Sequence, residues 1–237
     1  MNMKPKVASI ILILFCSVLV LPALAEKEVR SVSDFSEISL HISGKLYLEQ
    51  SDRQRVEIVA KSSTLEDIVT EVKGGKLIIR FKNRNVFWRS FNPGSIEIHV
   101  SAPEIEGLSV SGSGDIIADG LISSRRMSLA VSGSGGIKLD DLRSNRVKAS
   151  VSGSGGLFIG NGGMAEEFEA SISGSGNVRA EDFEAENVEV HVSGSGNCSI
   201  HAVETLKARV AGSGSVYYSG NPQVDSSVSG SGRVRNR

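Results

Sequence analysis

Three carboxylates recur at comparable places in the second half of the chain: Asp119, Asp140 and Glu181. The last two each follow a basic residue by two positions, Lys138 and Arg179 respectively. Enzymes that cleave glycosidic bonds use two carboxylates about 5–10 Å apart. A polysaccharide-acting β-helix enzyme, a lyase or a hydrolase, is therefore the alternative function that these outward residues raise. A solvated charged face that keeps the protein soluble would give the same pattern.

Aromatic and basic residues gather between positions 82 and 94. The sole tryptophan, Trp88, and two of the eight phenylalanines fall within five residues, beside Arg89. Such residues form binding hot spots and sugar-stacking platforms, so Phe87, Trp88, Arg89 and Phe91 are the candidate binding residues. The same segment would also serve as a cap that folds over an open end of the domain and shields its core. The sequence leaves both interpretations open.

Other kinds of site find no support in the residues. After Gly112 and Gly114 the third glycine of a dinucleotide fingerprint is missing, and no Gly-Lys-Ser/Thr follows any glycine-rich stretch. An aspartate follows such a stretch only at Asp115, whereas a calcium ladder needs carboxylates in coil after coil. The four histidines lack the spacing of metal ligands. We therefore predict no catalytic residue, no metal site and no cofactor.

The strongest pattern is a tetrapeptide, Ser-Gly-Ser-Gly or a near copy, that occurs seven times between residues 111 and 232. Successive copies are separated by 18 to 21 residues. A period near 20 is typical of a solenoid, in which each repeat is one coil that stacks on the next. The copies begin at Ser111, Ser132, Ser152, Ser173, Ser193, Ala211 and Ser229.

Apolar residues keep constant places around each motif. If its first residue is position 0, then positions −5, −3, −1, +5 and +7 hold mainly Val, Ile, Leu and Ala, as at Val131, Val151 and Ile137. Alternation with period two predicts a strand on each side of a four-residue corner, with alternate side chains pointing inward. We therefore expect an all-β fold, a parallel β-solenoid similar to a β-helix, with coils of about 20 residues.

Small residues would shape the corners and one outer surface. Glycine allows positive φ or close approach of two backbones. Position +4 is mostly Gly, Asn or Asp, as at Asn177 and Asn197. These types tolerate the left-handed region, so we expect that conformation there as well. The outward position −2 is small in most coils, as at Ser109 and Ser150. This would give a flat face for a partner or for a second copy of the chain.

Residues 26–103 are also β-rich, but less regular. Gly74-Gly75 indicates a hairpin turn, and Ser63 with Glu66 fits a capping box for one helical turn near Leu65. Since Ile42-Ser43-Gly44-Lys45 resembles half of the repeat motif, we expect this part to continue the solenoid of residues 104–237. A small sheet packed on its end is the alternative. Strands are expected at 38–42, 46–48, 56–59, 77–81 and 96–100.

Residues 1–25 are expected to be a signal peptide and not part of the fold. Lys4 and Lys6 precede an apolar stretch at 7–21, and small residues lead to a cleavage site after Ala25. The apolar stretch is short for a membrane span. We therefore expect an exported protein without a membrane span. The sole cysteine beyond this segment, Cys198, occupies an inward column and is expected to be buried rather than reactive.

The charges are almost balanced, with 26 Lys and Arg against 27 Asp and Glu. This composition gives no electrostatic argument for nucleic acid as a partner. An unknown protein or glycan, or a second copy of the chain, is the partner that we expect.

The register of the Ser-Gly-Ser-Gly-Asx corners with the Val and Ile columns, and the lead-in of Phe35, Ile38 and Leu40, resemble a known family. It is the putative auto-transporter adhesin, head GIN domain family of bacterial envelope proteins, whose function is unknown. The resemblance covers about residues 32–234. It implies a right-handed β-solenoid and a location in the periplasm or cell envelope of a Gram-negative bacterium, or secretion. It carries over no catalytic residues.

The sequence therefore favours an exported, non-catalytic envelope protein that offers an adhesin-like binding surface to an unknown ligand. Its long, regular coils predict a rigid surface, and neither a nucleophile motif nor a metal site accompanies them.

Overall fold

The computed structural model describes residues 25–82 and 93–237, which are almost entirely β-structure. One helical turn, α1 (Ser62–Asp67), is the exception among them. The strands of the N-terminal part are β1 (Ala25–Arg30), β2 (Glu37–Leu40), β3 (Lys45–Gln50), β4 (Arg55–Lys61), β5 (Ile68–Lys73), β6 (Lys76–Phe81) and β7 (Glu97–Ala102). The strands of the repeat region are β8 (Gly107–Gly112), β9 (Asp115–Gly133), β10 (Gly136–Gly153), β11 (Gly156–Gly162), β12 (Ala165–Gly174), β13 (Asn177–Gly194), β14 (Asn197–Gly212), β15 (Ser215–Ser219), β16 (Gln223–Gly230) and β17 (Arg233–Asn236).

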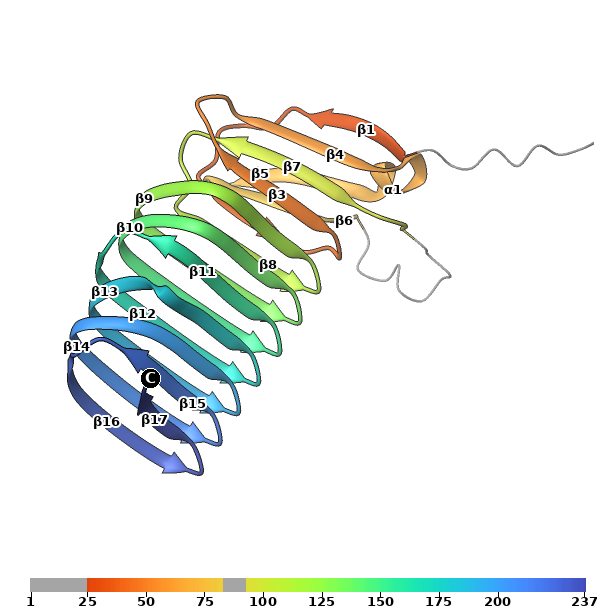
Figure 1. Ribbon diagram of the computed structural model, residues 1–237. Helices are drawn as coiled ribbons and strands as arrows, with labels where there is room; N and C mark the ends of the chain where they lie inside the picture. The colour runs from red at the N-terminus through yellow and green to blue at the C-terminus, as the bar shows by residue number, and fades with distance from the viewer. Residues whose placement is uncertain (1–24, 83–92) are drawn as a thin grey trace, which may run out of the picture.

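The repeat region is a parallel β-solenoid, as the sequence predicts. Each coil pairs in register with the next, so that Ile116 lies beside Ile137 and Val131 beside Val151. Figure 1 shows the coils stacked along one axis, each with a sharp corner on one side and a wider bend on the other. The sharp corners are the Ser-Gly-Ser-Gly motifs. The solenoid has about six turns.

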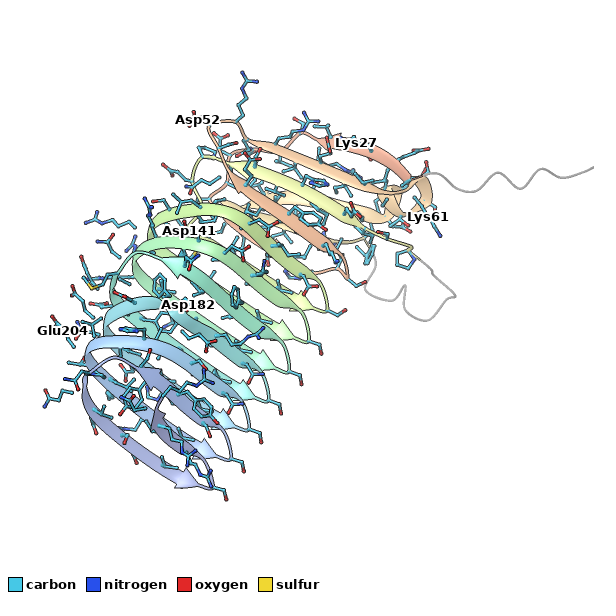
Figure 2. All side chains as sticks on the ribbon, in the orientation of Figure 1. Lys27, Asp52, Lys61, Asp141, Asp182 and Glu204 are labelled. Atoms are coloured by element: carbon cyan, nitrogen blue, oxygen red, sulfur yellow. The ribbon has the colours of Figure 1, made fainter. Side chains whose placement is uncertain are left out.

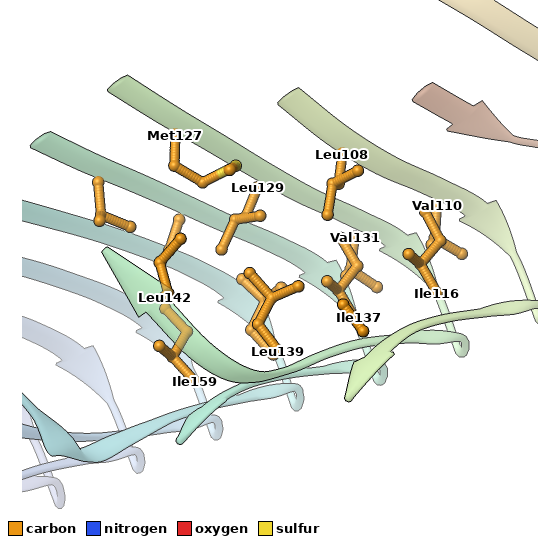
Figure 3. Packing of buried hydrophobic residues seen from close by; sticks show 14 of the residues in the cluster. Leu108, Val110, Ile116, Met127, Leu129, Val131, Ile137, Leu139, Leu142 and Ile159 are labelled. Carbon is orange, nitrogen blue, oxygen red and sulfur yellow. The ribbon is translucent and has the colours of Figure 1, made fainter. Parts of the chain in front are cut away.

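The inward columns form one continuous core. Leu129 and Val131, before a corner, and Ile137 and Leu139, after it, are at most 2% exposed. Figure 3 shows such residues of successive coils stacked between the two walls. β-branched and other aliphatic side chains suit this narrow space because they pack well on a pleated, extended backbone.

Each corner needs its two glycines for different reasons. The first glycine of the motif has φ between 111° and 123° in all seven copies, a region that residues with a Cβ rarely adopt. The second glycine lies against the previous coil. A Cβ on Gly155 would overlap the carbonyl oxygen of Gly135 and lie 2.6 Å from Cγ1 of Val131. The corners also bond to each other, since the carbonyl of Gly133 accepts the N–H groups of Ser154 and Gly155, each at 2.9 Å.

Position +4 differs from the expectation. No non-glycine residue among those described has positive φ, so Asn177 and Asn197 are not left-handed. Their side chains instead bind the next coil. Oδ1 of Asn177 accepts the backbone N–H of Asn197, and Oδ1 of Asn197 accepts that of Ser215, both at 3.1 Å. Asparagine therefore recurs here because it bridges coils, not because it tolerates a strained backbone.

The N-terminal part contributes further coils, in a spatial order that differs from the chain order. β2 and β3 lie directly on β8 and β9, with parallel pairing. Gly44 occupies the place of a corner glycine, since its carbonyl accepts the N–H of Asp115 at 2.9 Å. β6 and β7 then lie on the other edges of β2 and β3, also parallel. The chain thus inserts the coil of β2 and β3 between the first regular coil and the layer of β6 and β7.

Antiparallel strands and α1 close this end of the solenoid (Figure 1). β5 pairs with β6 through the predicted hairpin at Gly74-Gly75, β4 pairs with β7, and β1 pairs with β4. Within this cap Glu57 is buried, and its carboxylate lies 2.7 Å from Nζ of Lys27. Lys27 and Arg55 hold the pKa of the Glu57 carboxyl below its ordinary value. We name β1, β4, β5 and α1 the N-terminal cap.

The predicted helical turn is present, but its predicted start is wrong. The helix begins at Ser62, and its N-cap is Lys61, which makes no side-chain capping bond. Ser63 is therefore not the cap residue of a capping box. Thr64 is buried and donates its hydroxyl to the carbonyl of Pro93 at 2.9 Å, so tertiary contacts hold the turn in place.

The corner geometry yields a matched test on adjacent residues. Gly155→Ala should lower the free energy of unfolding by about 1–3 kcal/mol or more, because its Cβ would overlap the previous corner. Gly156→Ala should change it by no more than about 0.5 kcal/mol, since its Cβ would meet no atom closer than 3.6 Å. Denaturant unfolding of both variants measures the difference. Equal stability of the two variants would contradict this account of the corners.

Candidate functional site

The solenoid presents two broad outer faces, one on each side of the corners. We call the outward residues of the strands that follow the corners the post-corner face, represented by Lys138, Phe158 and Arg179. We call those of the strands that precede the corners the pre-corner face, represented by Lys148 and Glu169. Figure 2 shows that charged side chains occur along the whole molecule, from Lys27, Asp52 and Lys61 near the N-terminal end to Asp141, Asp182 and Glu204 along the solenoid.

One outward column runs along nearly the full length of the post-corner face. Strand register places its members side by side in successive coils, about 4.8 Å apart. Apart from Ile117, the column consists of aromatic, basic and small residues, unlike the aliphatic columns inside. Its members, from the N-terminal end, are His99, Tyr47, Ile117, Lys138, Phe158, Arg179, Ser199, Tyr217 and Arg235.

A depression of about 740 Å³ crosses the post-corner face close to the corners. Gly136 and Gly156 line it at position +4, where the lack of a side chain leaves space between the larger neighbours. Phe158, Arg179 and Tyr217 also line it. The site is therefore an elongated, open groove over several coils rather than an enclosed pocket.

Guanidinium groups stack on both aromatic rings of this groove. Cζ of Arg179 lies 5.7 Å from the ring centre of Phe158, and Cζ of Arg237 lies 4.8 Å from that of Tyr217. Arg237 also forms an ion pair with Glu181 at 2.8 Å. Arg179 has no ion-pair partner among the described residues. Its hydrogen-bonding capacity is therefore free for a ligand, while the ring of Phe158 orients it.

The two carboxylates of the enzyme alternative lie beside one lysine. Nζ of Lys138 is 2.8 Å from Asp140 and 3.5 Å from Asp119. These contacts, first of all the hydrogen bond that Lys138 donates to Asp140, raise the pKa of Lys138 above its ordinary value. Lys138 lines the groove, but neither aspartate does. One lysine thus bridges the two carboxylates, and the arrangement does not leave two free carboxylates on opposite sides of a sugar-sized space.

The pre-corner face has a similar depression of about 720 Å³, but ion pairs fill it. Lys148 binds Glu169 at 3.1 Å, and Lys207 binds Glu189 at 2.7 Å. Arg146 and Glu167 lie 3.4 Å apart. Because most of its charges already have partners in the adjacent coil, this face has less to offer a ligand than the post-corner face.

The small residues at position −2 also lie on the pre-corner face, and they face outward as predicted. Ser109 is half-buried and donates its hydroxyl to that of Ser39 in the neighbouring coil at 2.7 Å. His191 and Arg209 interrupt the flat strip, and a small residue, Ser227, follows them in the same column.

Cys198 is fully buried, as predicted, and burial raises the pKa of its thiol to about 12. Among the described residues, no group of three His, Cys, Asp or Glu is placed to hold a metal ion. In that part of the chain, no helix has the length and apolar character needed to cross a membrane.

The aromatic segment chosen from the sequence, with Phe87, Trp88, Arg89 and Phe91, lies outside the described residues. Sequence reasoning did not select Phe158 or Tyr217. A pattern in the sequence could have identified them, because both residues stand six positions after the start of a corner motif. They belong to the outward column that lies between the inward columns at positions +5 and +7.

Comparison with known proteins agrees with this architecture. The model of the putative auto-transporter adhesin, head GIN domain family matches residues 34–222. No curated protein sequence matches the chain. Several crystal structures share its fold.

The crystal structure of a putative lipid binding protein from Parabacteroides distasonis is 26% identical, with a TM-score of 0.74, over 90% of this chain and 97% of its own. A putative adhesin from Bacteroides fragilis is 24% identical, with a TM-score of 0.77 and the same coverage. A putative adhesin from Parabacteroides merdae is 18% identical, with a TM-score of 0.68, over 90% of this chain and 96% of its own. The last two show the fold alone.

The family match covers most of the chain, and the fold, corners and inward columns are those that the resemblance implies. This chain belongs to the putative auto-transporter adhesin, head GIN domain family.

Proposed function

We propose that this protein is an exported, non-catalytic envelope protein whose post-corner face binds a protein or glycan partner. The observation that carries the proposal is the groove of about 740 Å³, in which Phe158 and Tyr217 are each stacked with an arginine. Aromatic and arginine side chains contribute most of the energy at many binding interfaces.

The rigidity of the coils supports this role. The backbone ladders and the packed core hold each outward column at a regular spacing, and Phe158 keeps the guanidinium of Arg179 oriented. A preorganised surface loses less conformational entropy when a partner binds. An extended partner that crosses several coils would therefore bind without rearrangement of the protein.

Two other functions have less support. A polysaccharide-cleaving enzyme would need Asp119 and Asp140 free, whereas both lie beside Lys138. The name of the Parabacteroides distasonis relative suggests lipid binding. The inward columns here are filled by side chains such as Ile137 and Leu139, so a lipid would have to lie on an outer face.

The aromatic segment between β6 and β7 is a second part of the proposed binding surface. β6 and β7, the strands on either side of this segment in the sequence, continue the two walls of the solenoid. The N-terminal cap already covers the end of the core. We therefore propose Phe87, Trp88, Arg89 and Phe91 as recognition residues rather than as a cap.

We further propose that residues 1–25 direct export and are removed, leaving residues 26–103 and 104–237 as one β domain in the periplasm or cell envelope of a Gram-negative bacterium. The basic start, apolar stretch and small-residue site of this segment support export. The family description, an auto-transporter adhesin, agrees with an envelope location.

The first test of the binding surface uses a glycan array and immobilised envelope proteins probed with the labelled protein. Phe158→Ala and Arg179→Ala should each weaken binding to the partner so found by more than about 1 kcal/mol, roughly fivefold in Kd. The matched control is Lys148→Ala on the pre-corner face, which should leave Kd unchanged.

An equal loss of affinity in the control would contradict the assignment of the binding face. Polysaccharide cleavage that Asp119→Asn or Asp140→Asn abolishes would overturn the non-catalytic role, and the same glycans can be examined for new reducing or unsaturated ends.

Trp88 provides a separate test of the aromatic segment. As the sole tryptophan, it reports on its surroundings without interference. If it belongs to a recognition surface, its fluorescence should respond to the partner, and Trp88→Ala should weaken binding by more than about 1 kcal/mol with little change in the melting temperature. A loss of stability of about 3–5 kcal/mol would instead identify it as a cap residue.

Export can be tested by mass spectrometry of the protein recovered from a cell envelope or periplasmic fraction. We expect a mature chain that begins at Glu26, because the small residues at Ala23 and Ala25 suit signal peptidase. A cytoplasmic protein that retains its first residues would contradict export, and a signal-deleted variant provides the cytoplasmic control.

A further inference from the structure

The last coil of the solenoid leaves part of its core exposed. Val224 and Val228 of β16 are 39% and 41% exposed, although they occupy inward columns. Their counterparts one coil earlier, Leu206 and Val210, are 1% and 2% exposed. The difference arises because no described residue packs on the far side of β16.

In the described part of the chain, the two strands at this end, β16 and β17, also each have an unpaired edge. β16 pairs with β14 on one side, and β17 pairs with β15 on one side; neither has a strand partner on its other edge among the described residues. The opposite end of the molecule differs, because the N-terminal cap adds antiparallel strands to both walls. Its outermost strand β1 carries Glu26, Lys27, Glu28 and Arg30, charges that discourage further pairing. The two ends of the solenoid are therefore not equivalent.

We propose that this open end pairs with the same end of a second copy of the chain. Because the corner reverses the chain, β16 and β17 run in opposite directions on opposite walls. A two-fold axis parallel to the strands then places β16 of each copy beside β17 of the other copy. The two strands of each pair are antiparallel, and the dimer contains two such pairs. This fold already accepts antiparallel strands on the edges of its parallel walls, as β4 on β7 and β5 on β6 show.

Charge selects this arrangement over the pairing of like strands. The outward residues of β17 are Arg233 and Arg235. If β17 paired with its own copy, arginines would lie opposite arginines, which is unfavourable. The outward residues of β16 carry no positive charge: Gln223, Asp225, Ser227 and Ser229.

Apolar matching selects the register. In the register that we propose, Val228 of one copy lies opposite Val234 of the other copy. The same register places Ser227 opposite Arg235 of the other copy, and Asp225 near Arg237 of the other copy. Asp225 already binds Arg209 at 2.7 Å, so the contact would extend an existing ion pair across the interface. Val224 and Val228 would then lie over the walls of the second copy and lose their exposure.

The dimer has a consequence for binding. The two-fold axis turns the post-corner faces of the two copies to opposite sides, so that one dimer presents two grooves facing away from each other. Such an arrangement would bridge two partners and raise their combined affinity. This consequence rests on the proposed function, whereas the dimer itself does not.

Sedimentation equilibrium of the purified protein from about 1 to 200 µM tests the association, since mass action makes it depend on concentration. We expect dimers at the upper end of this range. Val228→Asp should weaken dimerisation about tenfold or more, because it places a charge where the interface buries an apolar side chain. The control Leu121→Asp changes an apolar residue of β9 that is 40% exposed and several coils from this end, and it should have no effect.

A purely monomeric protein throughout that range would overturn the proposal, and so would equal weakening by the control. Circular dichroism melting of each variant separates loss of the interface from loss of the fold, since Val228 is not part of the closed core.

Cysteine cross-linking tests the arrangement itself. In a Cys16→Ser background the remaining native thiol is Cys198, which is buried with a raised pKa. The double variant Ser227→Cys with Arg235→Cys should form a covalent dimer on mild oxidation. Within one copy these two positions lie on opposite faces, so they cannot bond to each other there. Arg235→Cys alone should stay monomeric on a denaturing gel, because it would cross-link only if β17 paired with its own copy. A covalent dimer of that single variant would overturn the arrangement.

Discussion

The close approach of successive corners is the constraint on which the rest of the structure depends. At the second glycine of each motif, the backbone of one coil lies against that of the coil before it, as Gly155 does against Gly135. N–H groups such as that of Gly155 then reach the carbonyl of Gly133 in the previous corner. Since every corner repeats this contact, the coils stay in register, and the inward columns can stack residue on residue.

Register in turn determines what the surface can do. The inward columns must stay apolar and narrow, but the outward columns between them are free to vary. In one of them Phe158, Arg179 and Tyr217 form an aromatic and basic strip, while Lys148 and Glu169 on the opposite face neutralise each other. The same scaffold therefore carries one face with an aromatic and basic strip, in which Arg179 has no ion-pair partner among the described residues, and another face on which most charges are paired.

A terminal coil of a solenoid has a neighbour on one side only, so its core and strand edges must be covered by something other than another coil. At the N-terminal end, antiparallel strands and charged residues such as Glu28 terminate the walls. At the other end, the valines of β16 stay partly exposed. Among the described residues, one end of the solenoid is therefore covered by a cap and the other has partly exposed valines.

The sequence by itself determined the coils. The spacing of the motifs, the columns that contain Val131 and Val151, and the hairpin at Gly74-Gly75 each follow from local rules of period and backbone conformation. Tertiary structure decided what depends on neighbours distant in the chain. The stacking of the coils makes Asn177 a bridge between them and brings Phe158 beside Arg179. Tertiary contacts also start α1 at Ser62 and place the coil of β2 and β3 beside β8 and β9. Residues about 20 apart meet only after the coils have stacked, so their contacts cannot be read from either residue alone.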